Sequence, residues 1–465
     1  MTVRRTSMHG EWSSRMAFIL AATGSAVGLG NIWRFPYITG ENGGGAFVLV
    51  YLLCIALIGV PIMMAEVLLG RRGRQSPINT MRTLATEEGH SPLWQLLGWA
   101  GVISGFLILS FYSVIAGQAL AYIARAAGGL FTGITVADSK QIYAALETDP
   151  ERLLAWHTLF MAMTMVVVAR GVKSGLEQAV RFLMPALLIM MLVLLGYAMS
   201  TGAFAQAMRF LFRPDFTALT WNAVLTAMGQ AFFTLSLGMG AIMVYGSYLP
   251  KRASIVQTSI TIAAADTMVA LLAGMVIFPI VFINGLEPTA GPSLVFKTLP
   301  IAFGQMWGGP FFGALFFLLL SFAAWTSAIS LIEPAVAWMV ENHGMSRTKA
   351  AVWAGAITWV LGLGTVLSSN LWSEVTLFGK TFFGVLEYLT FNVMLPLGGL
   401  FIALFAAWLM SRRSTVDELA IGDGLGYETW RFLVRFISPA AVIIVFLYVI
   451  GLLPLISKAI KAMFT

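Results

Sequence analysis

Long apolar segments alternate with short polar connections along almost the whole chain. A bilayer core takes roughly 20 consecutive apolar residues for each helical crossing. The pattern predicts an all-α membrane protein with about eleven transmembrane helices, folded as one transmembrane domain over residues 1–465. The apolar segments begin near Trp12, Phe47, Trp94, Trp156, Val180, Trp221, Ile255, Phe311, Val352, Phe382 and Phe432.

Two of these segments contain residues that a lipid-crossing helix avoids. The stretch SAVGLGNIWRFPY, residues 25–37, places two glycines, Asn31 and Arg34 in mid-membrane, and FFTLSLGMG, residues 232–240, places Ser236 and two glycines there. Glycine weakens a helix by roughly 1 kcal/mol relative to alanine, and a charge near the bilayer centre costs more. Because these segments are the first and the sixth, they indicate an inverted-repeat transporter with a binding site at the midplane.

Unwound backbone at that depth offers amides at one half-helix end and carbonyls at the other, which suit an anion and a cation respectively. Close helix–helix packing is a simpler alternative, because GSAVG (residues 24–28) also fits a small-xxx-small contact. A phosphate-binding loop does not fit, since no strand precedes the glycines and no Lys-Ser/Thr pair follows them.

Composition places most of the chain in lipid. Its 465 residues are 58% hydrophobic and 11% charged, whereas soluble proteins average about 25% charged residues. The net charge of +7 follows the positive-inside rule better than nucleic-acid binding, because most Lys and Arg fall in alternate loops. The amino terminus is therefore predicted to be cytoplasmic. The single cysteine, Cys54, excludes a disulfide framework within the chain.

Two other functional classes lack their sequence features. The four His residues form no His-Glu-x-x-His motif, and no Gly-x-Ser-x-Gly motif is present, so an embedded hydrolase is not predicted. An ion channel is not predicted either, because an open pore would not need asymmetric broken helices with an outer and an inner gate.

Four motifs, AVGLGNIWRFPY, ENGGGAF, GQAFFTLSLGMG and FAAWTSAISLIEP, occur in a specific order and spacing. On these residues the chain resembles bacterial members of the neurotransmitter:sodium symporter family, in the leucine-transporter-like branch of amino-acid transporters. The resemblance covers nearly the whole chain. It implies two inverted five-helix repeats, helices 1–5 and 6–10, with helices 1 and 6 broken. The repeats are expected over about residues 12–200 and 221–410, with an extra helix at about 430–455.

The resemblance also implies the activity. The chain is expected to import neutral hydrophobic L-amino acids together with sodium, by alternating access across the cell (inner) membrane. An osmolyte such as betaine or taurine is the alternative cargo. The expected partners are the amino acid, sodium ions and the lipid bilayer, with no nucleic acid, no enzymatic reaction and no organic cofactor.

Two sodium sites follow from the resemblance, and their oxygen ligands suit a hard cation. The first site uses the Ala26 carbonyl and the side chains of Asn31, Thr234 and Asp266. The second uses the carbonyls of Gly24, Val27 and Ala323 with the hydroxyls of Thr326 and Ser327. From the residues alone, these two hydroxyls could instead bond to their own helix.

Asp266 departs from relatives that carry a neutral Asn at this position. Chloride-dependent animal members obtain a compensating negative charge from chloride, and a carboxylate here would supply that charge itself. The resemblance therefore predicts transport that is independent of chloride.

The substrate is expected between the two breaks. Its carboxylate would meet the amides of Leu29 and Gly30 and the Tyr112 hydroxyl, and its ammonium would meet carbonyls near Ala26 and Phe233. Gly28 replaces the Asp of monoamine carriers, which favours an α-amino acid. The implied substrate-binding residues are Ala26, Gly28, Leu29, Gly30, Ile108, Tyr112, Phe233, Thr234, Ser236, Met239, Ala328 and Leu331.

Two gates complete the expected mechanism. Outside, Arg34 is expected to pair with Glu387, with Gln230 and Phe233 completing the closure. Inside, Trp12, Tyr248 and Glu341 match the family's closure, but His9 stands where the family has an Arg. Two further acids in apolar segments, Glu66 and Glu333, are read as structural carboxylates in preference to a proton relay.

Overall fold

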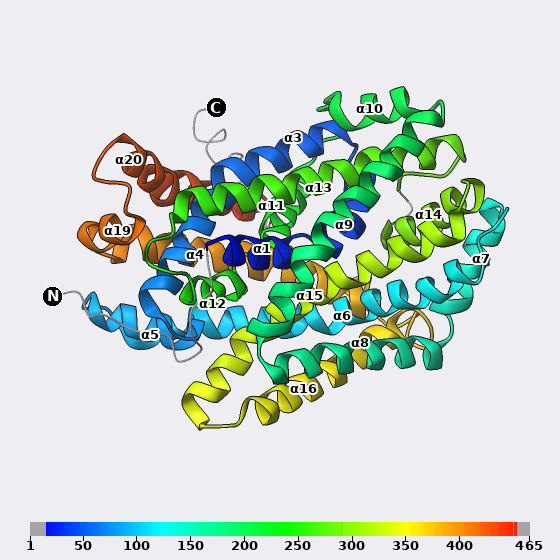
Figure 1. Cartoon of the computed structure of the whole chain (residues 1–465). Helices are drawn as coiled ribbons and strands as arrows, with labels where there is room; N and C mark the ends of the chain where they lie inside the picture. The colour runs from blue at the N-terminus through cyan, green and yellow to red at the C-terminus, as the bar shows by residue number, and fades with distance from the viewer. Residues whose placement is uncertain (1–14, 290, 450, 453–465) are drawn as a thin grey trace.

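Most of the described chain is helical in the computed structural model (Figure 1). The structure describes residues 15–289, 291–449, 451 and 452, without the side chains of residues 15, 17 and 172–183. Eight of the described helices are long and apolar enough to cross a membrane, and the bent pair formed by α9 and α10 adds at most a ninth. Two further spans are interrupted, which agrees with the predicted count of about eleven.

The first half contains five spans and three shorter helices outside them. Its first span is broken as predicted, because Val27 and Gly28 are not helical. The spans are α1 (Arg15–Ala26) with η1 (Gly30–Arg34) and α2 (Phe35–Glu41); α3 (Gly45–Cys54) with η2 (Ile55–Gly59) and α4 (Val60–Gly73); η3 (Pro92–Trp94) with α6 (Gln95–Ala127); α8 (Pro150–Arg170); and α9 (Val172–Ser200). The shorter helices are α5 (Pro77–Glu87), α7 (Val136–Glu147) and α10 (Phe204–Phe212).

The second half also begins with a broken span, as predicted. Residues 235–240 separate its two parts, and three of them, Ser236, Gly238 and Gly240, have positive φ angles of 57°, 75° and 77°. The spans are α11 (Trp221–Thr234) with α12 (Ala241–Ser247); α13 (Ile255–Ile283); α15 (Gly309–His343); α16 (Arg347–Ser368); and α17 (Phe382–Glu387) with η5 (Tyr388–Met394), α18 (Leu395–Leu404) and η6 (Phe405–Leu409).

An eleventh span follows the two halves, and short elements connect the others. This last span is α20 (Leu425–Phe432) with η7 (Leu433–Ile437) and α21 (Ser438–Val449). The connecting elements are η4 (Gly291–Ser293), α14 (Leu294–Gln305), α19 (Arg412–Leu419) and a hairpin of β1 (Thr376–Leu377) and β2 (Lys380–Thr381).

Several helices begin earlier than hydropathy predicts. α8 starts at Pro150 instead of near Trp156, because Asp149 caps it by accepting a bond from the Arg152 amide at 3.0 Å. α9 starts at Val172 instead of near Val180, and α20 starts at Leu425 instead of near Phe432. Hydropathy detects the apolar part of a helix, whereas the polar first turns extend beyond it.

The long helices lie roughly parallel and form two packed groups (Figure 1). α6 packs along α15, and α8 and α16 pack against each other and against α6. The broken spans belong to the other group, in which α11 contacts α3, α12 contacts α4, and α1 contacts both α13 and α15. The two groups therefore meet along the first broken span, and this places the breaks in the interior of the molecule.

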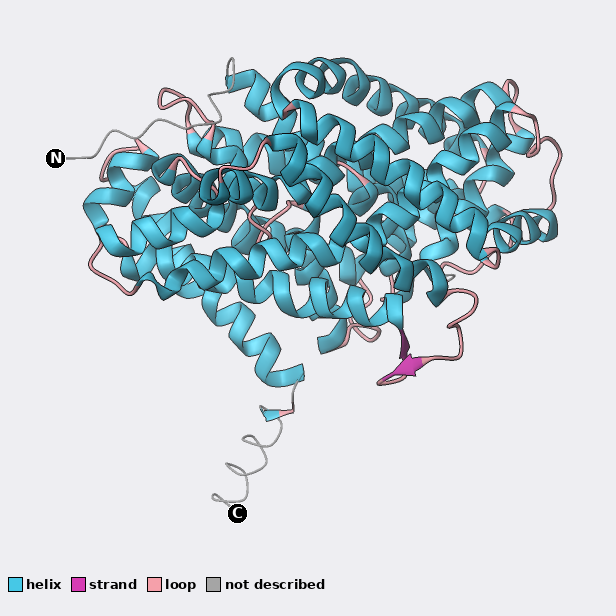
Figure 2. Ribbon diagram, turned by 90° about the horizontal axis from the view of Figure 1, so that it is seen from below, coloured by secondary structure: helices cyan, strands magenta, loops and turns pink. Residues whose placement is uncertain are grey.

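The short helices gather at opposite ends of the bundle. Figure 1 shows α5 and α19 at one end and α7, α10 and α14 at the other. The hairpin of β1 and β2 lies apart from both groups and projects sideways from the bundle (Figure 2).

Candidate functional site

The two breaks lie side by side at the centre of the bundle. The Ser236 hydroxyl in the second break donates a hydrogen bond to the Ser25 carbonyl at the first break, at 3.3 Å. The second break is held by Glu66, whose carboxylate accepts a hydrogen bond from the Gly238 amide at 2.6 Å. This contact agrees with the structural role predicted for Glu66, because the carboxylate replaces the helical partner that the amide has lost.

The side chains predicted for the first sodium site lie close together next to the two breaks. The Asn31 amide nitrogen donates to Asp266 Oδ1 at 2.7 Å and to Thr234 Oγ1 at 2.9 Å. The Thr234 hydroxyl in turn donates to both Asp266 carboxylate oxygens at 2.9 Å. The Gly28 amide donates to Asn31 Oδ1 at 3.0 Å, which joins the first break to the same cluster.

The charge of this cluster is not balanced. Asn31, Thr234 and Asp266 are all buried. No Lys or Arg of the described residues forms an ion pair with Asp266. A buried carboxylate is costly unless a positive charge accompanies it. Its oxygen-rich surroundings therefore fit a hard cation such as sodium.

The second predicted set also converges, between α1 and α15. The Thr326 hydroxyl donates to the Gly24 carbonyl at 2.5 Å and to the Ala323 carbonyl at 2.9 Å. The Ser327 hydroxyl donates to the Ala323 carbonyl at 3.1 Å and to the Ser25 carbonyl at 2.8 Å. Each hydroxyl bonds both to its own helix and to a carbonyl of α1 next to the first break, and the role of the two hydroxyls as sodium ligands stays a prediction. Val27, the remaining predicted ligand, is the first residue of that break.

A small cavity lies between the breaks, and most of it is lined by predicted substrate residues. Its free volume is about 10 Å³, which is room for about one water molecule. An amino acid therefore requires the walls to move apart. The lining residues are Ser25, Ala26, Gly30, Tyr112, Phe233, Ser236, Met239, Ser327, Ser330 and Leu331.

Five predicted substrate residues lie outside this lining. They are Gly28, Leu29, Ile108, Thr234 and Ala328. The Leu29 amide nevertheless donates to the Tyr112 hydroxyl at 3.3 Å, so the two groups predicted to bind the substrate carboxylate lie next to each other. A Cβ atom added to Gly28 would lie 2.5 Å from Ser327 Oγ and 2.8 Å from the Tyr112 hydroxyl. Gly28 therefore leaves space for these two hydroxyls.

Two lining serines were missed by the sequence analysis. Ser25 donates to Ser330 Oγ at 2.6 Å, and Ser330 donates to the Ser327 carbonyl at 2.7 Å. Ser330 follows Ser327 by three residues, so helical spacing places both on one face. That spacing was the signal available in the sequence.

The predicted outer gate is closed. Arg34 donates through Nε to Glu387 at 3.2 Å and through Nη1 to Gln230 at 2.6 Å. Its guanidinium also lies 4.1 Å from the centre of the Phe391 ring, and Tyr37 donates to the same Glu387 carboxylate. The Gln230 side chain donates to the Gly30 carbonyl at 2.8 Å, so the gate is connected directly to the first break.

The inner side is described only in part, because His9 and Trp12 lie outside the described residues. The Tyr248 hydroxyl donates to Glu333 at 3.4 Å, and Glu333 pairs with Arg347 at 2.5 Å. Glu333 is therefore paired, which agrees with its predicted structural role.

Glu341 contacts the start of α5. It accepts hydrogen bonds from the Ser76 amide at 2.8 Å and from the Asn79 side chain at 2.8 Å. A carboxylate is favoured at the amino-terminal end of a helix. The gating role of Glu341 stays a prediction.

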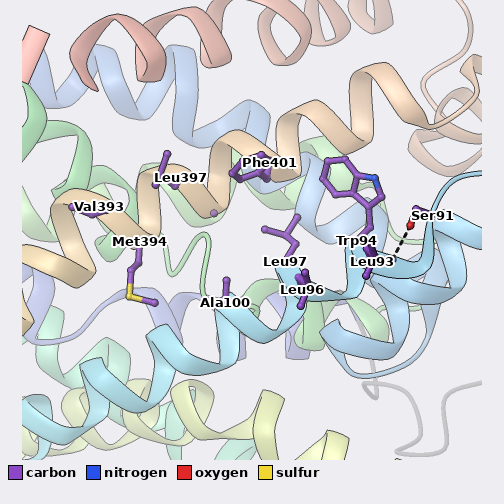
Figure 3. Close-up of a pocket in the computed structure, with 11 residues that line it drawn as sticks. Ser91, Leu93, Trp94, Leu96, Leu97, Ala100, Val393, Met394, Leu397 and Phe401 are labelled. Atoms are coloured by element: carbon purple, nitrogen blue, oxygen red, sulfur yellow. Dashed lines mark hydrogen bonds between the residues drawn. The ribbon is translucent and has the colours of Figure 1, made fainter. Parts of the chain in front are cut away.

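A roomier groove elsewhere does not resemble a site for a charged substrate. It lies between the start of α6 and the tenth span and has a volume of about 500 Å³ (Figure 3). Its lining is apolar apart from Ser91, and Leu93 and Leu96 are 64% and 60% exposed. The ammonium and carboxylate of an amino acid would lack partners there. The polar cavity between the breaks is therefore the candidate site.

Two broken helices that enclose a polar cavity at mid-span, beneath a closed ion-pair gate, define a secondary transporter. The model of the sodium:neurotransmitter symporter family matches residues 9–131 and 147–459. The chain belongs to this family of sodium-dependent transporters, and it is a transporter rather than an enzyme.

Individual relatives cover almost the whole chain. The uncharacterized sodium-dependent transporter YhdH of Bacillus subtilis (strain 168) is 40% identical over 446 residues, covering 95% of this chain and 98% of its own length. A similar transporter of Haemophilus influenzae is 33% identical, covering 94% and 97%. The crystal structure of MhsT in complex with L-phenylalanine is 43% identical with a TM-score of 0.91, covering 94% of this chain and 99% of that one.

Proposed function

We propose that this transporter imports neutral hydrophobic L-amino acids by alternating access, coupled to two sodium sites and independently of chloride. Sodium entering the cell contributes about 2.3 kcal/mol per charge for each 100 mV of membrane potential. The amino terminus and the α5 end of the bundle are placed on the cytoplasmic side of the cell membrane.

The observation that carries the proposal is the buried Asp266 carboxylate beside the cavity. It has hydrogen-bond donors from Asn31 and Thr234 but no cationic side-chain partner among the described residues. A sodium ion at this place would supply the missing charge. It would also attract the carboxylate of a bound amino acid, which is the physical basis proposed for the coupling.

The amino-acid assignment is supported by residues that line the cavity and by residues beside it. Tyr112 and the amide of Leu29 offer donors for a carboxylate, and Gly28 provides no side-chain charge for an amine. The cavity lining also contains Met239 and Leu331, which are apolar, and methionine adapts to varied shapes. The similar protein MhsT was solved with L-phenylalanine, and a hydrophobic side chain fits the same kind of wall.

The second sodium site is proposed from the carbonyls of Gly24, Val27 and Ala323 with Thr326 and Ser327. The cytoplasmic placement of the α5 end is supported by its Arg and Lys residues. Arg72 lies in the last turn of α4, and Arg82, Lys251 and Arg413 lie in the connections at that end, as the positive-inside rule requires of residues on the cytoplasmic side.

Uptake into proteoliposomes tests the proposal. Radiolabelled phenylalanine, leucine, alanine, betaine and taurine would be offered with external sodium or choline, and with chloride or gluconate. We expect uptake of the hydrophobic amino acids in sodium, little in choline, and no change in gluconate. Uptake that is indifferent to sodium would refute the coupling. Uptake of betaine or taurine alone would assign the alternative cargo, and loss of uptake in gluconate would refute chloride independence.

A further inference from the structure

The hairpin between the ninth and tenth spans exposes an apolar surface that the transport site does not use. Every residue from 371 to 380 is exposed. Half of these residues are large and apolar, and together they form what is called here the hairpin patch: Leu371 (72% exposed), Trp372 (40%), Val375 (62%), Leu377 (58%) and Phe378 (93%).

Phe378 combines an unfavourable backbone conformation with an almost fully exposed ring. The two-residue turn between β1 and β2 contains Phe378 at φ 53° and Gly379 at φ 73°. Two positive φ angles define a turn that favours Asn-Gly, and a bulky residue is disfavoured at its first position. Since the ring is almost fully exposed, the described part of the chain offers little contact that would favour it, whereas a contact with the surroundings would.

The root of the hairpin lies at the edge of the membrane-spanning region. Ser369 and Asn370 donate to the carbonyl of Glu147, at 3.3 and 3.2 Å. Glu147 is the last residue of α7, directly before the span α8, while α16 ends at Ser368 and α17 begins at Phe382. Three spans therefore begin or end around this root.

From this root, the hairpin projects away from the side of the helix bundle. In Figure 2 the bundle runs horizontally, and the hairpin projects perpendicular to its long axis, beside the helices and short of their end. The hairpin patch follows α16, a helix that is long and apolar enough to cross a membrane. Four apolar residues of α16 are 46–61% exposed: Val352, Trp353, Ile357 and Val360.

We propose that the hairpin patch is a membrane-interface anchor, whose partner is the lipid headgroup and upper acyl region of the leaflet on the α7 side. Aromatic and aliphatic side chains favour this zone, and Trp favours it especially because its ring is amphipathic. The ammonium of Lys380 lies 5.3 Å from the centre of the Tyr388 ring, and a lysine stem of this kind can reach towards phosphate. The interface fits better than the hydrocarbon core, because the outer edges of a two-stranded hairpin leave backbone groups that need water.

Fluorescent probes test the proposal on the full-length protein in lipid nanodiscs. Phe378→Cys and Leu371→Cys would be labelled with an environment-sensitive dye, in a background carrying Cys54→Ser. Lys140→Cys, on the exposed surface of α7 at the same end of the bundle, is the matched control. We expect nitroxide attached to the lipid headgroup to quench most of the signal at positions 371 and 378 but little at 140. Aqueous iodide should show the reverse order.

Two outcomes would overturn the proposal. Iodide quenching at 371 and 378 equal to that at 140 would place the patch in water. Protection from both quenchers would indicate a protein partner or a second copy of the chain. Phe378→Asn provides a variant that keeps the turn, because Asn suits its first position. In that variant the probe at 371 should become more accessible to iodide. The result does not depend on which substrate or ions are transported.

Discussion

At the scale of single residues, the account depends most on the charge of Asp266. Asn31 and Thr234 already direct hydrogen-bond donors at its carboxylate, but hydrogen bonds do not neutralise a buried charge. A sodium ion bound beside Asp266 would neutralise this charge. The need for a cation at this one carboxylate is therefore the proposed link between the site and ion coupling. The same carboxylate would supply the negative charge that chloride supplies in chloride-dependent members, which is the basis for the proposed independence of chloride.

Asp266→Asn keeps the size and the oxygen of this side chain but removes its charge. We expect the sodium concentration for half-maximal substrate binding to rise by about tenfold or more, because interactions with charged groups contribute about 1.5–3 kcal/mol. Titration of purified protein with sodium at fixed phenylalanine measures this change. Asp215→Asn, in an exposed connection, is the control. An unchanged sodium dependence would remove Asp266 from the site.

Substitution of Met239 tests which sizes of substrate side chain the cavity accepts. The Met239 side chain is buried and lines the cavity, so Met239→Trp should reduce phenylalanine uptake about tenfold more than alanine uptake. The reason is overpacking, which costs about 1–3 kcal/mol. Competition assays in proteoliposomes compare the two substrates. Met268→Trp, at a position 49% exposed on α13, should leave the ratio unchanged. The same ratio in both variants would contradict the assignment of Met239.

Most residues of the candidate site could be predicted from the sequence, but their closed arrangement could not. Gly28, Asn31 and Arg34 stood out because they are costly in a membrane helix, and this cost is visible in the sequence. Ser25 and Ser330 were missed because a serine can bond to its own helix in lipid, and the sequence does not show which cavity it faces. The three-residue spacing from Ser327 was a signal for Ser330, whereas Ser25 was recognised from packing between spans that are distant in the chain.

At the scale of elements, the two breaks were predicted and the π-helical turns were not. Glycines and polar residues at mid-span identify a break directly. The π-helical segments η2, η5, η6 and η7 differ from their neighbours in hydrogen-bond register, and their mostly apolar residues, with Thr390, Asn392 and Arg435 as polar exceptions, do not indicate that register. Hydropathy therefore located the spans, set several helix starts too late, and contained no information about register.

Substitution of Glu66 tests what stabilises the second helix break. Its carboxylate holds the Gly238 amide in the second break, so Glu66→Ala should leave that buried amide without its partner at a cost of about 1–3 kcal/mol. Glu66→Gln retains an acceptor oxygen and should lose less. Thermal unfolding in detergent, followed by tryptophan fluorescence, ranks the three proteins. Equal midpoints for all three would show that Glu66 does not support the break.

At the scale of the whole molecule, the structure is closed at the predicted outer gate. The Arg34 interactions with Glu387, Gln230 and Phe391 join the first, sixth and tenth spans above a cavity with room for about one water molecule. Admission of an amino acid therefore requires this joint to open, and the two packed groups of helices must move relative to each other.

Opening of the gate can be measured by thiol labelling. Leu331→Cys places a thiol in the cavity, and a charged, membrane-impermeant reagent should label it faster when Arg34→Ala is also present. The cause is loss of the ion pair with Glu387. Arg82→Ala, on α5 at the opposite end, should not change the rate, and the protein with Cys54 alone gives the background. Equal rates with and without Arg34 would show that closure depends on other contacts.

The central claim is that backbone freed at the two breaks forms the binding site, and Gly28 tests it most directly. Gly28→Ala would place a methyl group 2.5 Å from Ser327 Oγ, whereas the same change at Gly196, also within a span, meets nothing within 4 Å. Equilibrium binding of radiolabelled phenylalanine would be measured for both variants in sodium and in choline. The account predicts that sodium-dependent binding is lost in Gly28→Ala and retained in Gly196→Ala. Binding of wild-type strength by a folded Gly28→Ala protein would contradict it.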